Sequence, residues 1–160
     1  MIPPLLLWLF VLDLGVVFGA GLYEARISVP RWIGRSTATA DLAWHPEEAL
    51  RDDVGRRFWG PTTTVTLTLL TAANFWAAWE SVGPLRTWWL AAVLAALGDR
   101  VLTFSYFIPR MVSLLRTPNS PEARAKAIHW ARLGYVRLLL VLIAWLAAMR
   151  TFALLYQRGG

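Results

Sequence analysis

Long apolar stretches alternate with short polar connections along this chain. The apolar stretches lie within residues 3–27, 60–80, 87–110 and 121–156. Each range is long enough for the roughly 20 helical residues that cross a bilayer. The first stretch is expected to end before Pro30, and Gly60-Pro61 to open the second helix, because proline costs no hydrogen bond at a first helical position. Gly83-Pro84 separates the second stretch from the third, and Ser120-Pro121-Glu122 is a typical helix start. The pattern predicts an all-α, integral membrane four-helix bundle that forms one domain over residues 1–160.

Charged side chains interrupt the apolar stretches. Asp13 lies in the first, Asp99 and Arg100 in the third, and Arg150 in the last. A charge near the middle of a bilayer costs about 2.5–3.5 kcal/mol on insertion scales, so such residues usually face the bundle interior and pair there. Arg150 lies near a helix end, and its long side chain is expected to reach the membrane surface.

Polar side chains also recur at helical spacing, which places them on one face of each helix. The stripes are Asp13 with Glu24, then Thr64, Thr68, Thr71 and Asn74, and then Asp99, Thr103, Tyr106 and Arg110. Because lipid cannot satisfy these groups, they should converge on a common interior. Their depth can be measured from the cytoplasmic ends of the helices at about 1.5 Å per residue. By this depth they separate into a deep layer and a shallow layer. The deep layer holds Asp13, Asn74, Asp99 and Arg100, and the shallow layer holds Glu24, Tyr106, Arg110 and Arg137.

These charges have two interpretations. Adjacent Asp99 and Arg100 point to different helix faces and need not pair with each other. An ion pair between Asp13 and Arg100 would fix the helix register without chemistry, and threonines can bond to carbonyls of their own helix. A functional site is the alternative.

Composition supports the membrane class. The chain is 57% hydrophobic and 16% charged, whereas soluble domains carry about 25% charged residues. The net charge of +6 does not indicate nucleic-acid binding, because most basic residues flank the apolar stretches. The first connection holds Arg31, Arg35, Arg51, Arg56 and Arg57, and the third holds Arg110, Arg116, Arg124, Lys126 and Arg132. The positive-inside rule therefore predicts cytoplasmic connections and both termini on the non-cytoplasmic side. The expected location is a bacterial plasma membrane.

Few kinds of chemistry are available. The chain has no cysteine, and His45 and His129 belong to no ligand-spaced set, so neither a metal nor an organic cofactor is predicted. What remains is proton transfer by carboxylates, with arginine holding a developing oxyanion. Residues 45–51 are expected to form a short surface helix, and Trp32 and Trp44 to lie at the membrane interface.

Four segments together resemble the anthrone oxygenase-like family of small four-helix membrane proteins. They are GLYEARISVPRW (21–32), RRFWGPTT (56–63), TFSYFIPRMVSLL (103–115) and WARLGYVRLLL (130–140). The resemblance covers most of the chain and implies a four-helix bundle and, by analogy, oxidation of anthrones. Glu24, Trp130 and Arg137 match the family pattern. Arg110 follows Pro109 where the family often has Asn, and Gly134 stands where it often has His or Asn.

The predicted function is an enzyme that acts on a lipophilic polyketide or terpenoid without a cofactor, by oxygenation or by cyclisation or isomerisation. The candidate catalytic residues are Glu24, Asp13, Asp99 and Arg137. The candidate substrate-binding residues are Asn74, Arg100, Tyr106, Arg110 and Trp130. The alternatives are a non-catalytic membrane subunit or small-ligand carrier, and a protein that handles quinone or haem. The bilayer and a second copy of the chain are the other expected partners.

Overall fold

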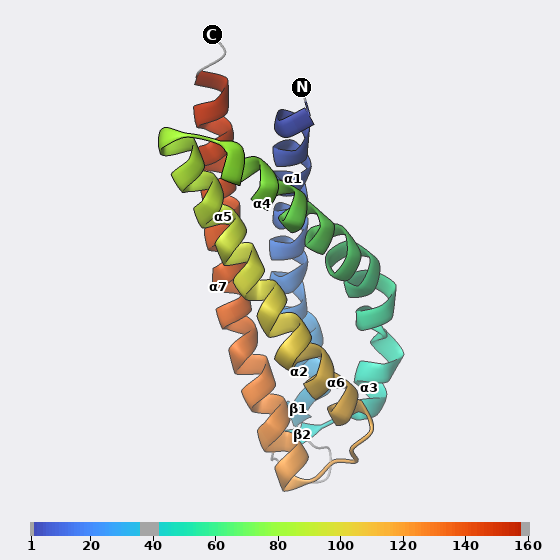
Figure 1. Cartoon of the computed structure of the whole chain (residues 1–160). Coiled ribbons are helices and arrows are strands. Elements are labelled where there is room, and N and C mark those ends of the chain that lie inside the picture. Colours follow the sequence, from blue (N-terminus) through green and yellow to red (C-terminus); the bar gives the residue numbers. More distant parts are fainter. Residues whose placement is uncertain (1, 36–41, 158–160) are drawn as a thin grey trace.

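The computed structural model describes residues 2–35 and 42–157, and helices make up nearly all of this part (Figure 1). The predicted all-α class is confirmed. The strands in the described part are β1 (Ile33–Arg35) and β2 (Leu42–Trp44), which form a short antiparallel pair with Ile33 opposite Trp44. In Figure 1 both ends of the chain lie at the end of the molecule opposite this pair.

The first helix is longer than the sequence predicts. It continues from α1 (Ile2–Tyr23) through the π-helical segment η1 (Glu24–Ser28) into α2 (Val29–Trp32). The prediction that it ends before Pro30 is wrong. A proline ring clashes with the carbonyl four residues earlier in an α-helix, and here that carbonyl belongs to Arg26, inside the wider π-helical turn.

The second helix also begins earlier than predicted. After α3 (Pro46–Asp52), the π-helical segment η2 (Gly55–Leu67) runs directly into α4 (Thr68–Glu80). Gly60-Pro61 therefore lies inside the helix and does not open it. Again, the missing N–H and the bulk of the ring are accommodated in a π-helical run, a common site of such irregularity.

The third helix comprises α5 (Gly83–Leu102), the π-helical segment η3 (Thr103–Phe107) and α6 (Ile108–Leu115). It is longer at both ends than the predicted 87–110. The break before it is confirmed, because Gly83 has a positive φ of 64° that favours glycine. The last helix, α7 (Pro121–Gln157), begins as predicted, and Ser120 Oγ accepts a hydrogen bond from the amide of Ala123.

Two buried clusters lie along the length of the molecule. The upper cluster joins α1, α4, α5 and α7, and small residues such as Ala92, Ala96 and Ala144 lie between α5 and α7. Small side chains allow helices to approach closely. The lower cluster, near the strands, is built on Trp32, Trp44, Phe107, Leu114 and Trp130.

The two tryptophans of the lower cluster pack inside the protein. Trp32 and Trp44 have only 1% and 2% of their surfaces exposed, so their rings contact protein groups. Trp32 Nε1 donates to Asp52 Oδ2 at 2.9 Å, and Trp44 Nε1 donates to the carbonyl of Leu114 at 3.1 Å. These bonds fix the predicted short helix α3 and the strand pair against the ends of the long helices.

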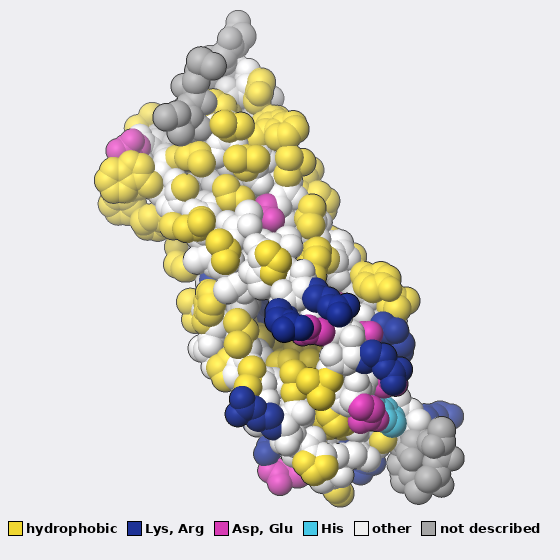
Figure 2. Space-filling model, turned by 90° about the vertical axis from the view of Figure 1, so that its right-hand side faces the viewer, with side chains coloured by type: hydrophobic (Ala, Val, Ile, Leu, Met, Phe, Trp, Pro, Cys, Tyr) yellow, Lys and Arg dark blue, Asp and Glu magenta, His cyan; other side chains and the backbone are white. Residues whose placement is uncertain are grey.

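Three helices in the described part are long and apolar enough to cross a membrane, namely Pro4–Trp32, Gly83–Leu115 and Pro121–Gln157. The helix from Gly55 to Glu80 is not among them, because its first half is rich in threonine. Large apolar side chains are exposed along the three helices, for example Leu9, Leu94 and Leu139. Figure 2 shows one face that is largely hydrophobic in its upper half, with the basic side chains gathered below.

Candidate functional site

A buried ion network joins the third helix to the last. Arg137 Nε on α7 donates to Asp99 Oδ1 on α5 at 3.0 Å, and Arg100 binds the other oxygen of Asp99 through Nε at 3.1 Å and through Nη2. Arg100 Nη1 also donates to the carbonyl of Thr63 at 2.7 Å. The side chain of Asp99 is fully buried, and that of Arg100 is 3% exposed. Two guanidinium groups thus share one carboxylate.

This network bears on three expectations. Asp99 and Arg100 do pair, because the long arginine side chain folds back onto the neighbouring carboxylate. Arg137 of the predicted shallow layer bonds Asp99 of the deep layer, so the two layers are joined. The predicted ion pair between Asp13 and Arg100 is not among the ion pairs of the described residues.

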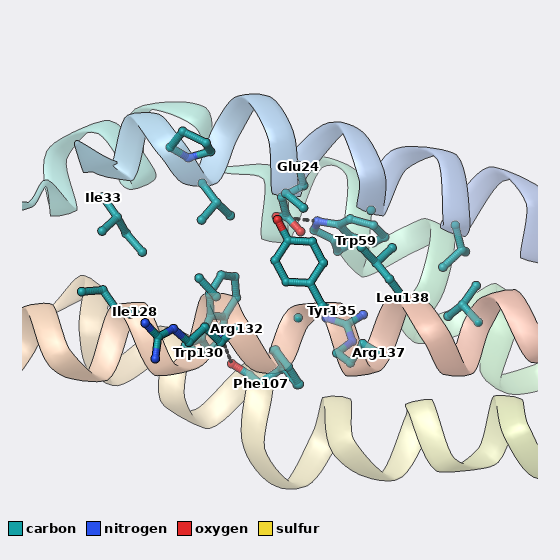
Figure 3. A pocket seen from close by; sticks show the side chains of 18 residues that line it. Glu24, Ile33, Trp59, Phe107, Ile128, Trp130, Arg132, Tyr135, Arg137 and Leu138 are labelled. Atoms are coloured by element: carbon teal, nitrogen blue, oxygen red, sulfur yellow. Dashed lines mark hydrogen bonds between the residues drawn. The ribbon is translucent and has the colours of Figure 1, made fainter. Parts of the chain in front are cut away.

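Glu24 lies beside this network, at the first residue of η1. Its Oε1 accepts a hydrogen bond of 2.9 Å from Trp59 Nε1 on η2. The guanidinium carbon of Arg137 lies 4.7 Å from the centre of the Phe107 ring and 6.0 Å from that of Trp59. Figure 3 shows Glu24 and Arg137 on opposite helices, with Trp59 and Phe107 beside them.

Two cavities meet at these residues. Cavity one has a volume of about 330 Å³ and lies between the first helix and α7. Cavity two has a volume of about 340 Å³ and lies between α3 and η2 on one side and η3 and α6 on the other. Both are large enough for a small ligand. The residues that line both are Glu24, Trp59, Phe107, Trp130 and Arg137.

The π-helical segments supply this shared wall. Glu24 opens η1, Trp59 lies in η2 and Phe107 ends η3. A proline follows two residues after η1 and after η3, and Pro61 lies inside η2. π-helical turns are frequent at functional sites, and here one occurs in each of three helices beside the cavities.

Glu24 and Arg137 provide two complementary functions. Arg137 uses Nε on Asp99, and among the described residues its terminal nitrogens have no hydrogen-bond acceptor. Preorganised donors of this kind stabilise a developing oxyanion. The Glu24 carboxyl, held through one oxygen by Trp59, can take up or release a proton. The aromatic rings around the pair suit a flat, apolar ligand.

The other predicted site residues lie away from both cavities, except Trp130. Asn74 is fully buried, donates to the carbonyls of Leu6 and Leu70, and accepts from Trp89 Nε1 at 3.0 Å, so its hydrogen bonds are structural. Trp130 lines both cavities, and its Nε1 donates to the carbonyl of Phe107.

Three polar residues lie near the network without joining it. Asp13 Oδ2 is buried and has no hydrogen-bond partner among the described residues, and the same is true of the Tyr106 hydroxyl. Arg110 stacks over the Tyr106 ring at 5.6 Å, and His129 meets the same ring edge to face. None of these side chains lines either cavity.

Sequence reasoning did not identify Trp59, Phe107 or Thr63 as site residues. Trp59 and Phe107 are two of many aromatic residues in a chain of membrane-helix composition, and Thr63 contributes only its carbonyl, which no side-chain pattern can indicate. The available signal was the position of Pro61 and Pro109, since prolines within apolar helices mark irregular turns.

No family model, curated protein or solved structure matches this chain. The resemblance to the anthrone oxygenase-like family therefore stays a prediction. Within residues 2–35 and 42–157, no three His, Asp or Glu side chains come together in a position to hold a metal ion.

Proposed function

We propose that this chain is a membrane-embedded enzyme that acts on a lipophilic small molecule of polyketide or terpenoid type. The observation that carries the proposal is the Glu24–Arg137 pair, in which a carboxyl and a guanidinium line the same aromatic cavity from opposite helices. Burial of both groups in an apolar site strengthens each electrostatic interaction with a bound ligand. The resemblance to the anthrone oxygenase-like family points to the same class of substrate.

In the proposed mechanism, Glu24 accepts a proton from an acidic carbon or phenol of the substrate. Arg137 donates hydrogen bonds to the resulting enolate or phenolate oxygen, a contribution typically worth about 10²–10³ in rate. Asp99 is a positioning residue, because it fixes the guanidinium through Nε.

Two outcomes are open to the enolate. Return of the proton from Glu24 to a different carbon completes an isomerisation and needs no further reactant. Oxygenation requires dioxygen as the oxidant, and a methylene group then becomes a ketone with release of one water molecule. Neither route uses a metal or an organic cofactor.

The proposed setting is a bundle of four membrane helices, alone or in a homo-oligomer, in the bacterial plasma membrane. The strand pair and α3 would face the cytoplasm and both termini the other side. The exposed arginines near the strands support this orientation, since basic residues favour the cytoplasmic side.

A non-catalytic membrane subunit is the second candidate. The observation that favours it is that Asp99, Arg100 and Asn74, three of the predicted site residues, bind protein groups and line neither cavity. Buried polar groups of this kind can serve helix register without chemistry.

The deciding experiment is native mass spectrometry of protein purified in a mild detergent, with extraction of the bound small molecules. The enzyme proposal expects a retained aromatic or terpenoid molecule that is lost in Glu24→Ala and Arg137→Ala but kept in the surface control Glu47→Ala. Anthrone added to the protein under air then tests oxygenation directly. A protein that carries only bulk phospholipid and converts nothing would favour the structural subunit.

A further inference from the structure

Cavity two contains a buried polar atom that the proposed reaction does not use. Thr103 lines this cavity, is 5% exposed, and its hydroxyl has no hydrogen-bond partner among the described residues. A buried hydroxyl without a partner destabilises the protein. A ligand that bonds to it would recover this cost.

Arg137 lies on the wall of the same cavity. Its terminal nitrogens have no acceptor among the described residues, and the network of Asp99, Arg100 and Arg137 has one positive charge more than it has negative charges. The inner end of cavity two thus offers guanidinium N–H groups and a hydroxyl, which together suit an acidic oxygen.

The outer end of cavity two is apolar and open to the side. Leu50 of α3 and Ile108 and Val112 of α6 line it and are 56%, 40% and 45% exposed. Below it, the lower cluster with Trp44 and Leu114 fills the space toward the strand pair. This opening is therefore apolar enough to admit a lipid chain.

At one edge of the mouth, Arg56 forms an ion pair of 2.8 Å with Asp53, and both residues line the cavity. A charge at the mouth beside an apolar opening is typical of the level of lipid headgroups. The Arg56 side chain is 83% exposed and paired with Asp53, whereas that of Arg137 is 17% exposed, so Arg137 is the guanidinium at the inner end.

From these observations we infer that cavity two is a binding site for a single-chain amphiphilic acid, such as a fatty acid. The carboxylate binds Arg137 and the Thr103 hydroxyl at the inner end, and the chain leaves between α3 and α6 into the bilayer. The site shares Arg137 with cavity one, but its occupation does not require the reaction proposed above. It would place an acid from the membrane against the far side of the Glu24–Arg137 pair.

The test uses palmitic acid with a photoreactive diazirine at the chain end, added to the whole protein in phosphatidylcholine nanodiscs. The matched probe is palmityl alcohol with the same diazirine. After illumination, the labelled residues are mapped by mass spectrometry. The acid is expected to label α3 and α6 around Leu50, Ile108 and Val112, and the alcohol to label them about tenfold less, as expected for loss of a charge-assisted hydrogen bond.

Variants assign the label to one cavity. Gly55 lines cavity two, and an added Cβ there meets no atom within 4 Å, so Gly55→Phe adds a ring at the edge of the cavity without a clash at the backbone. Gly19 is equally open but lines neither cavity, so Gly19→Phe is the matched control. Val112→Trp is a second filling variant in case Gly55→Phe folds poorly. Both filling variants are expected to lower acid labelling about tenfold, and the control to leave it unchanged.

Several results would overturn the inference. Equal labelling by the acid and the alcohol would mean that the carboxylate is not recognised. Labelling concentrated on Trp59 or Trp130 would mean that the chain end, and not the acid, lies inside. Loss of the label in Gly134→Phe, which fills only cavity one, would place the acid in the other cavity. A protein that labels as expected but converts no substrate keeps this inference and loses the enzyme proposal.

Discussion

Arg137 on α7 and Asp99 on α5 are joined by a hydrogen bond of 3.0 Å between Nε and Oδ1, and this bond links the candidate site to the buried core. Asp99 is fully buried and also binds Arg100, so it neutralises one of two guanidinium groups inside the protein. Breaking such a network by removing one partner leaves an unpaired buried charge, which is far more costly than losing a surface pair.

Asp99→Ala is therefore expected to destabilise the protein by about 3–5 kcal/mol. Glu48→Ala, which removes a surface ion pair with Arg51 at 3.1 Å, should cost at most about 1 kcal/mol. Denaturant titration of both variants in the same detergent, followed by circular dichroism, measures the difference. Equal losses in the two variants would contradict a stabilising role for the network.

Arg137→Lys is expected to keep the fold and weaken ligand retention by about tenfold or more. Lysine preserves the charge but lacks the planar fork that bonds Asp99 through Nε while its terminal nitrogens face the cavity. Arg150→Lys, on the exposed face of the same helix, is the control. The readout is the fraction of purified protein that retains its molecule in native mass spectra, and an unchanged fraction would remove Arg137 from the binding site.

The sequence predicts those features of the fold that depend on the local pattern of residues. Helix positions follow from apolar stretches, and the boundaries at Gly83 and Ser120 follow from residues that act within their own turn. Depth along the helices predicts Glu24 and Arg137 in one layer, and the family resemblance adds Trp130. The structure brings these three residues to one pair of cavities.

The sequence could not predict which groups pair. The partners of Asp99 and Arg137 depend on how α5 and α7 lie against each other. The long side chain of Arg137 reaches from the predicted shallow layer to Asp99 in the predicted deep layer, although their backbone depths differ. The burial of Trp32 and Trp44 depends on how the strand pair and α3 close the end of the long helices. Periodicity contains no information about either arrangement.

Asn74→Ala is expected to lower stability by about 1–3 kcal/mol and to leave ligand retention unchanged. The change removes hydrogen bonds to the Leu6 carbonyl and from Trp89 Nε1, and leaves the buried indole N–H of Trp89 without its acceptor. Thr71→Val is the control, because its hydroxyl bonds only the carbonyl of Leu67 in the same helix. Parallel thermal unfolding and native mass spectrometry separate the two effects, and loss of ligand from a stable Asn74→Ala protein would restore Asn74 to the site.

Trp59→Phe is expected to reduce activity or ligand retention while the protein stays folded. Phenylalanine keeps an aromatic ring on the cavity wall but cannot donate the 2.9 Å bond that holds Glu24 Oε1. Trp79→Phe, an exposed residue at the other end of the same helix, is the matched control. Near-ultraviolet circular dichroism checks the packing of both variants. Retention equal to that of the control would mean that Glu24 does not need Trp59 to be oriented.

Gly134 offers a test of cavity one by size alone. It lines this cavity on α7, and an added Cβ meets no atom within 4 Å. Because glycine weakens a helix interior by about 0.5–1 kcal/mol relative to alanine, Gly134→Ala should raise the stability slightly and still bind ligand. Gly134→Phe adds a ring that fills the space, so it should fold and lose the ligand of cavity one, whereas Gly19→Phe on the exposed face of α1 should keep it. Binding that survives in Gly134→Phe would show that the ligand lies outside cavity one. Glu24 and Arg137 would then line a cavity that the substrate does not occupy.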